Sequence, residues 1–226
     1  MILQGDALTK IKEVSSKSIQ TVVTSPPYWG LRNYDNDEQL GQESSPDIFV
    51  KNLVKLFHEI KRVLKDNGTV WVNIGDTFFG PAGGYFESPN AEVRKSYREK
   101  RTSPPKHEYI KHGDLCGVPW KFAIEMQKDG WFLKQDIIWN KPNPVPEAVN
   151  NRCVKSHEYI FLFTKTKQYY FNAEDIMING VRRGSVWTMQ TAKFKEAHFA
   201  VFPEDIPALC IKAGSKEGDV VLDPFM

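Results

Sequence analysis

Cysteine is scarce in this chain of 226 residues, and the three that occur, Cys116, Cys153 and Cys210, lie far apart. An odd number of widely spaced cysteines builds no disulfide framework, and none of them forms the Cys-x-x-Cys pair that is typical of zinc sites. We therefore expect free thiols in a reducing compartment, and no metal site.

The sequence also lacks any apolar run near the roughly 18 residues that a membrane-spanning helix needs. Its first residues, Met1-Ile-Leu-Gln-Gly-Asp6, have neither the basic region nor the apolar stretch of a secretory signal peptide. These absences predict an intracellular, cytoplasmic protein with no membrane partner.

Net charge is nearly absent as well, because 30 Lys and Arg stand against 28 Asp and Glu. The overall charge of +2 therefore neither indicates nor excludes a polyanionic partner. One segment differs: between Glu92 and His112, seven Lys or Arg stand against three Glu. A loop that faces nucleic-acid phosphates fits this excess, and an ordinary solvated surface loop fits it equally well.

Apolar residues at helical spacing indicate three helices. Ser45 is a typical N-cap for the first, and a glycine in the left-handed conformation is expected to close it. In the second, we expect Trp120 and Ile124 to be among the buried side chains. The predicted helices run from Pro46 to a closing Gly68, from Val118 to Lys128, and from Pro203 to Gly214.

Runs rich in β-branched and aromatic residues indicate strands between these helices. The run 69–74 (TVWVNI) is nearly all apolar, as a strand buried on both faces would be. We expect 158–164 and 168–171 to form an antiparallel hairpin, because only a short basic linker separates them. The predicted strands are 18–24, 69–74, 131–139, 158–164, 168–171 and 219–223.

This order of elements predicts a single α/β domain over residues 1–226, with a mostly parallel sheet covered on both faces and one antiparallel hairpin. Parallel sheets bind ligands at the carboxyl ends of their strands. The segments that follow predicted strands are therefore candidates for function. They include Thr24 to Tyr28, Gly75-Asp76, for which a plain turn is an equal alternative, and Asp223 to Phe225.

The segment Thr24-Ser-Pro-Pro-Tyr-Trp-Gly30 carries the most specific chemistry. Two successive prolines lock the backbone and remove two N–H donors, which leaves carbonyl acceptors in a rigid turn. The Ser25 hydroxyl and the Tyr28 ring complete a surface that can hold a planar group bearing an exocyclic amine. The alternative is a stiff turn with a tyrosine packed in the core.

Further motifs accompany this loop in a particular order. They are Gly5-Asp6-Ala7, Ile137 to Pro142, His157 to Thr164, His198 to Pro203, and Asp219 to Met226. Together with the Ser-Pro-Pro-Tyr loop, they resemble the DNA amino-methyltransferases that use S-adenosylmethionine, whose catalytic loop reads Asp/Asn/Ser-Pro-Pro-Tyr/Phe. Because the catalytic loop precedes the cofactor strand, the order resembles the circularly permuted β subgroup of that family.

The resemblance implies a Rossmann-like methyltransferase fold and assigns roles to individual residues. Ser25 and the Pro26 carbonyl would accept hydrogen bonds from the target amine, with Pro27 stiffening the loop and Tyr28 stacking on the flipped base. For Asp6 the alternative is a helix N-cap, and for His198 and Phe202 it is packing at a helix entry. The implied cofactor residues are Asp6, Thr24, His198, Phe202, Pro203, Asp223, Pro224 and Phe225.

Serine at the first position of the catalytic loop is typical, within this family, of cytosine-N4 methylation, whereas aspartate is typical of adenine-N6. We expect cytosine N4 as the target, with adenine N6 as the alternative. A catalytically inactive DNA-binding fragment is the rival from another class. Methylation of RNA or of a protein amide is less favoured, because those relatives typically carry Asn-Pro-Pro-Tyr after an unpermuted cofactor motif.

Double-stranded DNA is the implied partner, and a cognate restriction endonuclease is a second candidate. Two loop insertions, 79–117 and 172–196, are the candidate elements for reading a short site, because their arginines suit guanine edges. The expected DNA-contacting residues are Arg94, Lys95, Arg98, Arg101, Lys141, Arg182 and Arg183.

The sequence departs from the family pattern at its end. It stops at Met226, directly after Asp-Pro-Phe, where the family continues into a glycine-rich turn, a helix and another strand. Half of the cofactor cradle would come from that part. We therefore expect a truncated fold: a fragment, a split enzyme completed by a C-terminal segment, or a degenerate protein. Alone, it is expected to bind S-adenosylmethionine poorly.

Overall fold

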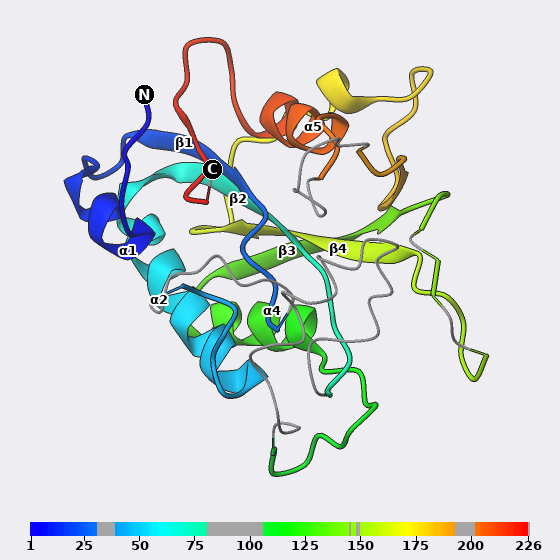
Figure 1. Cartoon of the computed structure of the whole chain (residues 1–226). Helices are drawn as coiled ribbons and strands as arrows, with labels where there is room; N and C mark the ends of the chain where they lie inside the picture. The colour runs from blue at the N-terminus through cyan, green and yellow to red at the C-terminus, as the bar shows by residue number, and fades with distance from the viewer. Residues whose placement is uncertain (31–38, 81–105, 145, 148–149, 193–201, 226) are drawn as a thin grey trace.

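A computed structural model describes residues 1–30, 39–80, 106–144, 146–147, 150–192 and 202–225 (Figure 1). Within these residues one sheet has the strand order β5-β3-β4-β2-β1-β6. Three of its pairings, β1–β2, β1–β6 and β3–β5, are parallel. The strands are β1 (Ile19–Thr24), β2 (Leu64–Ile74), β3 (Phe132–Asn140), β4 (His157–Thr164), β5 (Val186–Thr188) and β6 (Val221–Leu222).

The antiparallel strand is the predicted one, but its predicted hairpin partner is wrong. β4 pairs along one edge with β2 and along the other with β3. Both of its edges are therefore filled, and 168–171 has no strand beside which to pair. Those residues run past the amino end of the sheet instead, where the Tyr170 N–H donates to the Asn67 carbonyl at 2.8 Å.

Helix α2 (Pro46–Val63) begins as predicted, with the Ser45 hydroxyl accepting from the Ile48 N–H at 3.3 Å. The prediction that Gly68 closes it is wrong, because the chain turns directly into β2 at Leu64. Gly68 lies inside β2, where a methyl group would come within 2.7 Å of the Gln20 carbonyl oxygen. The glycine therefore serves close strand packing rather than a helix end.

Helix α4 (Val118–Lys128) has the predicted bounds, but two of its predicted core residues are exposed. Trp120 is 40% exposed and Ile124 is 47% exposed. The buried face follows Val118, Phe122 and Met126, which are spaced four residues apart and therefore share one side of the helix. Residues 120 and 124 lie on another side of it.

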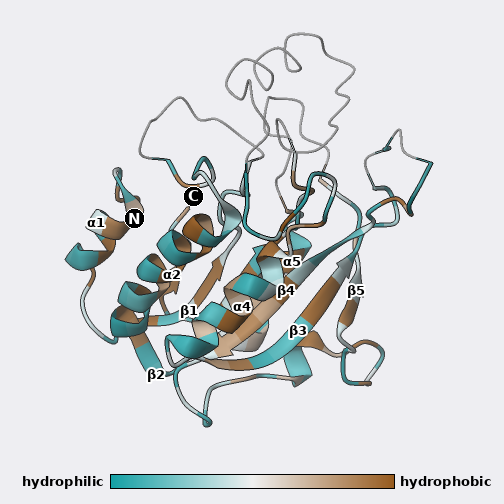
Figure 2. Cartoon of the chain, turned by 90° about the horizontal axis from the view of Figure 1, so that it is seen from below, coloured by the Kyte–Doolittle hydropathy of each residue, from teal (hydrophilic) through white to brown (hydrophobic). Residues whose placement is uncertain are grey.

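The sheet is covered on both faces, as predicted. Helices α2 and α4 lie across one face, and α5 (Asp205–Gly214) lies on the other (Figures 1 and 2). Neighbouring strand residues divide between two separate cores: Val22 packs on the α2 and α4 side, and Val23 packs on the α5 side. Short helices α1 (Ala7–Lys10), η1 (Ile11–Glu13) and η2 (Glu174–Ile176) complete the described elements.

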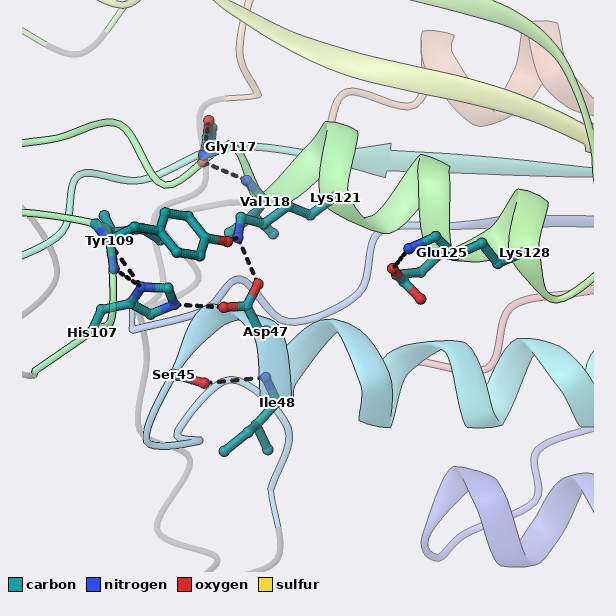
Figure 3. Close-up of polar contacts among 12 residues, drawn as sticks. Ser45, Asp47, Ile48, His107, Tyr109, Gly117, Val118, Lys121, Glu125 and Lys128 are labelled. Carbon is teal, nitrogen blue, oxygen red and sulfur yellow. Dashed lines mark hydrogen bonds and ion pairs between the residues drawn. The ribbon is translucent and has the colours of Figure 1, made fainter.

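The first turns of α2 and α4 are joined to the segment that follows residue 105 by a polar cluster (Figure 3). Asp47 binds Lys121 Nζ through Oδ1 and His107 Nε2 through Oδ2, both at 2.5 Å. His107 Nδ1 accepts from the N–H groups of Tyr109 and Ile110 at 3.3 and 3.2 Å, so the ring proton lies on Nε2. The cluster therefore holds the end of the 79–117 insertion against both helices.

Burial opposes ionisation of Asp47, but the hydrogen bonds from Lys121 and His107 outweigh it and lower the pKa of the carboxyl. The ionised form is therefore favoured by folding. Separately, no helix in the described part of the chain is long and apolar enough to cross a membrane.

We predict that Asp47→Asn lowers the free energy of unfolding by about 1 kcal/mol at pH 7, because it replaces a carboxylate with two cationic or N–H donors by an amide. A lowered folded-state pKa means that the stabilisation is present above the ordinary value of about 3.9 and is lost as the pH falls through the folded-state value. Urea unfolding from pH 7 down to pH 3 should show the gap to wild type narrowing below about pH 4.

Glu125→Gln is the matched control, because Glu125 makes only an exposed ion pair with Lys128 on the same helix α4 (Figure 3). We expect it to cost less than about 0.5 kcal/mol. An Asp47→Asn effect no larger than this control, or one that stays constant down to pH 3, would contradict the assignment.

Candidate active site

The Ser-Pro-Pro-Tyr loop begins directly at the carboxyl end of β1, the strand between β2 and β6. Pro26 is buried, whereas Ser25, Pro27 and Tyr28 are only partly covered. The far side of the loop is closed by a hydrogen bond from the Gly30 N–H to the Gly41 carbonyl at 2.7 Å. Ser25 and Tyr28 therefore lie on a turn that is anchored at both ends.

The Tyr28 side chain is held at its hydroxyl and along its ring edge. The hydroxyl donates to the Glu158 carboxylate and lies 3.5 Å from Asn73 Oδ1. The ring edge lies against the backbone at the end of β2, where a methyl group on Gly75 would come within 2.6 Å of Tyr28 Cε2. Only glycine leaves room for the ring in this position.

Glu158 is the centre of this polar network. Its Oε2 also accepts from Asn73 Nδ2 at 3.1 Å, and its Oε1 accepts from Lys141 Nζ. The Glu158 and Lys141 side chains are only 13% and 17% exposed. Lys141 Nζ also lies 4.3 Å from the centre of the Trp139 ring. A largely buried carboxylate is thus compensated by one ammonium group and by hydrogen bonds from the elements around it.

Burial shapes the electrostatics of this edge. Removal from water, and then the neighbouring Glu158 carboxylate, raise the pKa of the Tyr28 hydroxyl well above its ordinary value, so the phenol stays protonated. Burial also lowers the pKa of Lys155, whose Nζ donates to the Asp76 carbonyl at 2.6 Å.

Asp76 has a structural partner rather than an open carboxylate. Its Oδ1 accepts from the N–H groups of Thr77 and Val118 at 2.9 and 3.0 Å, and its Oδ2 accepts from Gly117 at 2.9 Å. These bonds satisfy free N–H groups at the start of α4. The side chain therefore joins β2 to α4 and positions the edge that carries Tyr28.

The ends of β1 and β6 meet, as parallel neighbours must. Thr24 Oγ1 donates to Asp223 Oδ1 at 2.6 Å, and the Phe225 N–H donates to the same oxygen at 3.0 Å. Among the described residues, every hydrogen bond of Asp223 falls on Oδ1, which leaves Oδ2 for a ligand. Burial raises the pKa of Asp223, and the bonds from Thr24 and Phe225 oppose the shift.

Other predicted cofactor residues have local structural roles. Asp6 is exposed and caps α1, accepting from the Thr9 N–H at 2.8 Å. Phe202 packs against the core on the α5 side, and the buried Pro203 accepts from the Ile206 N–H at 3.0 Å at the start of α5. The N-cap and helix-entry alternatives are thus observed for these residues. Pro224 is partly buried after Asp223, and His198 lies outside the described residues.

The predicted DNA-contacting residues divide into three groups. Lys141 is bonded to Glu158, as described above. Arg182 is exposed, while Arg183 donates to the Ile176 carbonyl at 3.1 Å and lies 5.9 Å from the centre of the Trp187 ring. Outside the described residues are Arg94, Lys95, Arg98 and Arg101.

Sequence reasoning missed Asn73 and Glu158 as site residues. Each had a signal, because each is a polar residue within or beside an apolar strand: Asn73 in TVWVNI and Glu158 at the start of EYIFLFT. Buried polar groups in strands need partners, and here the partners are one another and Tyr28.

The chain was compared with known proteins. It is 45% identical to the Type II methyltransferase M.Cfr9I of Citrobacter freundii, over 99% of this chain and 75% of the relative. It is also 45% identical to M.SmaI of Serratia marcescens, over 99% of this chain and 78% of the relative. Among solved structures, the PvuII DNA methyltransferase, which is cytosine-N4-specific, matches 97% of this chain and 71% of its own with a TM-score of 0.70 at 19% identity.

A second solved structure is a DNA modification methylase from Thermus thermophilus complexed with S-adenosyl-L-methionine. It matches with a TM-score of 0.62 at 22% identity, over 98% of this chain and 76% of its own. These two likenesses confirm the Rossmann-like methyltransferase fold. The sequence profile of the DNA methylase family matches residues 19–226. The chain therefore belongs to the N6/N4 DNA methylase family and is a DNA methyltransferase of that type.

Proposed function

We propose that this protein transfers a methyl group from S-adenosylmethionine to the exocyclic amine of a base flipped out of double-stranded DNA, with cytosine N4 as the target. The observation that carries the proposal is the Ser25-Pro-Pro-Tyr28 loop at the carboxyl edge of β1, with its tyrosine ring held in place. Thr24 and Asp223 lie at the same edge, so the acceptor loop and the candidate cofactor residues are neighbours.

The residues at the end of β6 fit the cofactor. S-adenosylmethionine carries ammonium, hydroxyl and N–H groups, and Asp223 offers a partly buried carboxylate with Oδ1 bonded and Oδ2 available. Thr24 holds the orientation of that carboxylate. When bound, S-adenosylmethionine supplies an electrophilic methyl group on a sulfonium centre.

The chain's own residues orient the nucleophile. Ser25 Oγ and the Pro26 carbonyl accept from the two N–H bonds of the target amine, which directs its lone pair out of conjugation with the ring. Tyr28 stacks on the face of the flipped base. Positioning and electrostatics then lower the barrier, and no covalent enzyme intermediate is needed.

Ser25 favours cytosine over adenine, because serine at this position is typical of cytosine-N4 enzymes in the family that the chain resembles. Both bases place an exocyclic amine beside a ring nitrogen, so adenine N6 is the competing target. The exposed Arg182 is the described side chain best placed for DNA phosphates or guanine edges.

Product analysis tests the reaction directly. After incubation of the chain with unmethylated DNA of mixed sequence and isotopically labelled S-adenosylmethionine, we expect digestion and mass spectrometry to detect N4-methylcytosine. Labelled N6-methyladenine would keep the reaction class and replace the target base. Absence of any labelled nucleoside would favour the inactive DNA-binding alternative.

Tyr28→Ala is expected to lower the single-turnover methylation rate by roughly 100-fold, because stacking on the base is worth about 1–3 kcal/mol per base. DNA affinity should stay within about threefold, since phosphate contacts supply most of it. Tyr170→Ala, the same change at the amino end of the sheet, is the matched control. An equal loss of rate and affinity in Tyr28→Ala would assign Tyr28 a structural role instead.

Asp223→Asn should separate stability from cofactor binding. A raised folded-state pKa means that the acid contributes stability below its ordinary pKa, about 3.9, and loses it as the pH rises through the folded-state value. At pH 7 the neutral asparagine should therefore melt at or above the wild-type temperature, with the difference vanishing near pH 3. Calorimetry should show weaker S-adenosylmethionine binding, and unchanged affinity would remove Asp223 from the cofactor site.

A further inference from the structure

Three donors from three different strands or loops converge on one carboxylate beside the catalytic loop. They are the Tyr28 hydroxyl, Asn73 Nδ2 and Lys141 Nζ, and all three bind Glu158. We propose that Glu158 is a positioning residue that sets the plane of the Tyr28 ring before the target base arrives. This role rests on the proposed function, in which that ring stacks on the base.

Glu158 is well suited to hold another side chain, because it is itself held. Its Oε1 is bonded to Lys141, and its Oε2 is shared by Asn73 and Tyr28. Asn73 is in turn fixed by a second bond from Nδ2 to the Tyr159 carbonyl at 3.2 Å. With both oxygens engaged and 13% of the side chain exposed, the carboxylate has little freedom to rotate away.

Gly75 supplies the second constraint on the ring. The ring edge lies so close to this residue that a single added methyl carbon would overlap Tyr28 Cε2 at 2.6 Å. The hydroxyl fixes the far end of the side chain, and the contact with Gly75 fixes the rotation of the ring about its own axis. Together they leave the two side-chain torsions of Tyr28 little range, so less ordering is needed when a base stacks.

The arrangement has a chemical consequence for recognition. The Tyr28 hydroxyl proton is directed to Glu158, so the residue offers a base its aromatic face rather than a hydrogen-bond donor. Aromatic faces stack on every base, so Tyr28 contributes binding without base discrimination. Discrimination would then depend on Ser25 and the Pro26 carbonyl.

A double-mutant cycle tests the coupling. Glu158→Gln keeps the size of the side chain but presents a single acceptor oxygen to three donors, so the hold on Tyr28 is lost or weakened. Tyr28→Phe removes the hydroxyl and keeps the ring. We expect each single variant to lower the single-turnover rate roughly 10- to 100-fold, and the double variant to be no slower than the slower single variant. DNA affinity should change less than about threefold in all of them.

The cycle can fail clearly. If Glu158→Gln slows the Tyr28→Phe protein by the same factor as it slows wild type, Glu158 does not act through Tyr28 and the proposal is overturned. A parallel loss of DNA affinity and rate would likewise indicate a general structural role. Tyr170→Phe, which removes a hydroxyl at the opposite end of the sheet, should change neither quantity.

Gly75→Ala perturbs the same ring without touching the charged network, and so covers the case in which Glu158→Gln does not fold. The added methyl must displace the ring, so we expect a rate loss of roughly 10-fold or more with DNA affinity preserved. A wild-type rate in this variant would overturn the proposal.

A spectroscopic readout separates this proposal from the proposed function. In the free protein, the carboxylate-bound Tyr28 hydroxyl proton should give a slowly exchanging, downfield NMR signal that is absent from Tyr28→Phe and lost or shifted in Glu158→Gln. If the signal is present and wild type methylates no DNA, the proposed function fails while the network stands. If wild type methylates DNA but the signal is absent, the positioning role fails alone.

Discussion

The antiparallel course of β4 is the constraint on which the rest of the site depends. A sheet built only of parallel strands would bring strand ends alone to its carboxyl edge. Because β4 runs the other way between β2 and β3, its first residues lie at that edge, and Glu158 meets Tyr28 and Asn73 there. The same course fills both edges of β4, which holds the central strands together and gives the catalytic loop a rigid support.

Charge is used differently in the two carboxylates whose pKa values move in opposite directions. Asp47 binds an ammonium and an imidazole N–H, so its ionised form stabilises the attachment of the 79–117 insertion to α2 and α4. Asp223 is buried with two neutral donors, so its ionised form is costly until a ligand compensates it. The first arrangement serves stability, and the second is typical of a binding site held ready.

Much of the scaffold could be predicted from local pattern. The bounds of α4 and the start of α2 follow from apolar spacing, the N-cap Ser45 and the position of Pro46. Errors arose where pairing partners or faces had to be inferred. The aromatic run 168–171 resembles a strand but has no free strand edge beside it, and Trp120 is apolar but lies on the outer side of its helix. Neither fact is encoded in a local window.

The sequence by itself determined the rigid acceptor loop, because two prolines restrict the backbone wherever the chain folds, and it determined strands that are buried on both faces. Its motifs were sufficient to indicate the family. Only the tertiary structure decided which groups hold the tyrosine. Asn73 and Glu158 lie 45 and 130 residues from Tyr28, and their meeting depends on the register of β4 against β2 and on a glycine that lets the ring lie close.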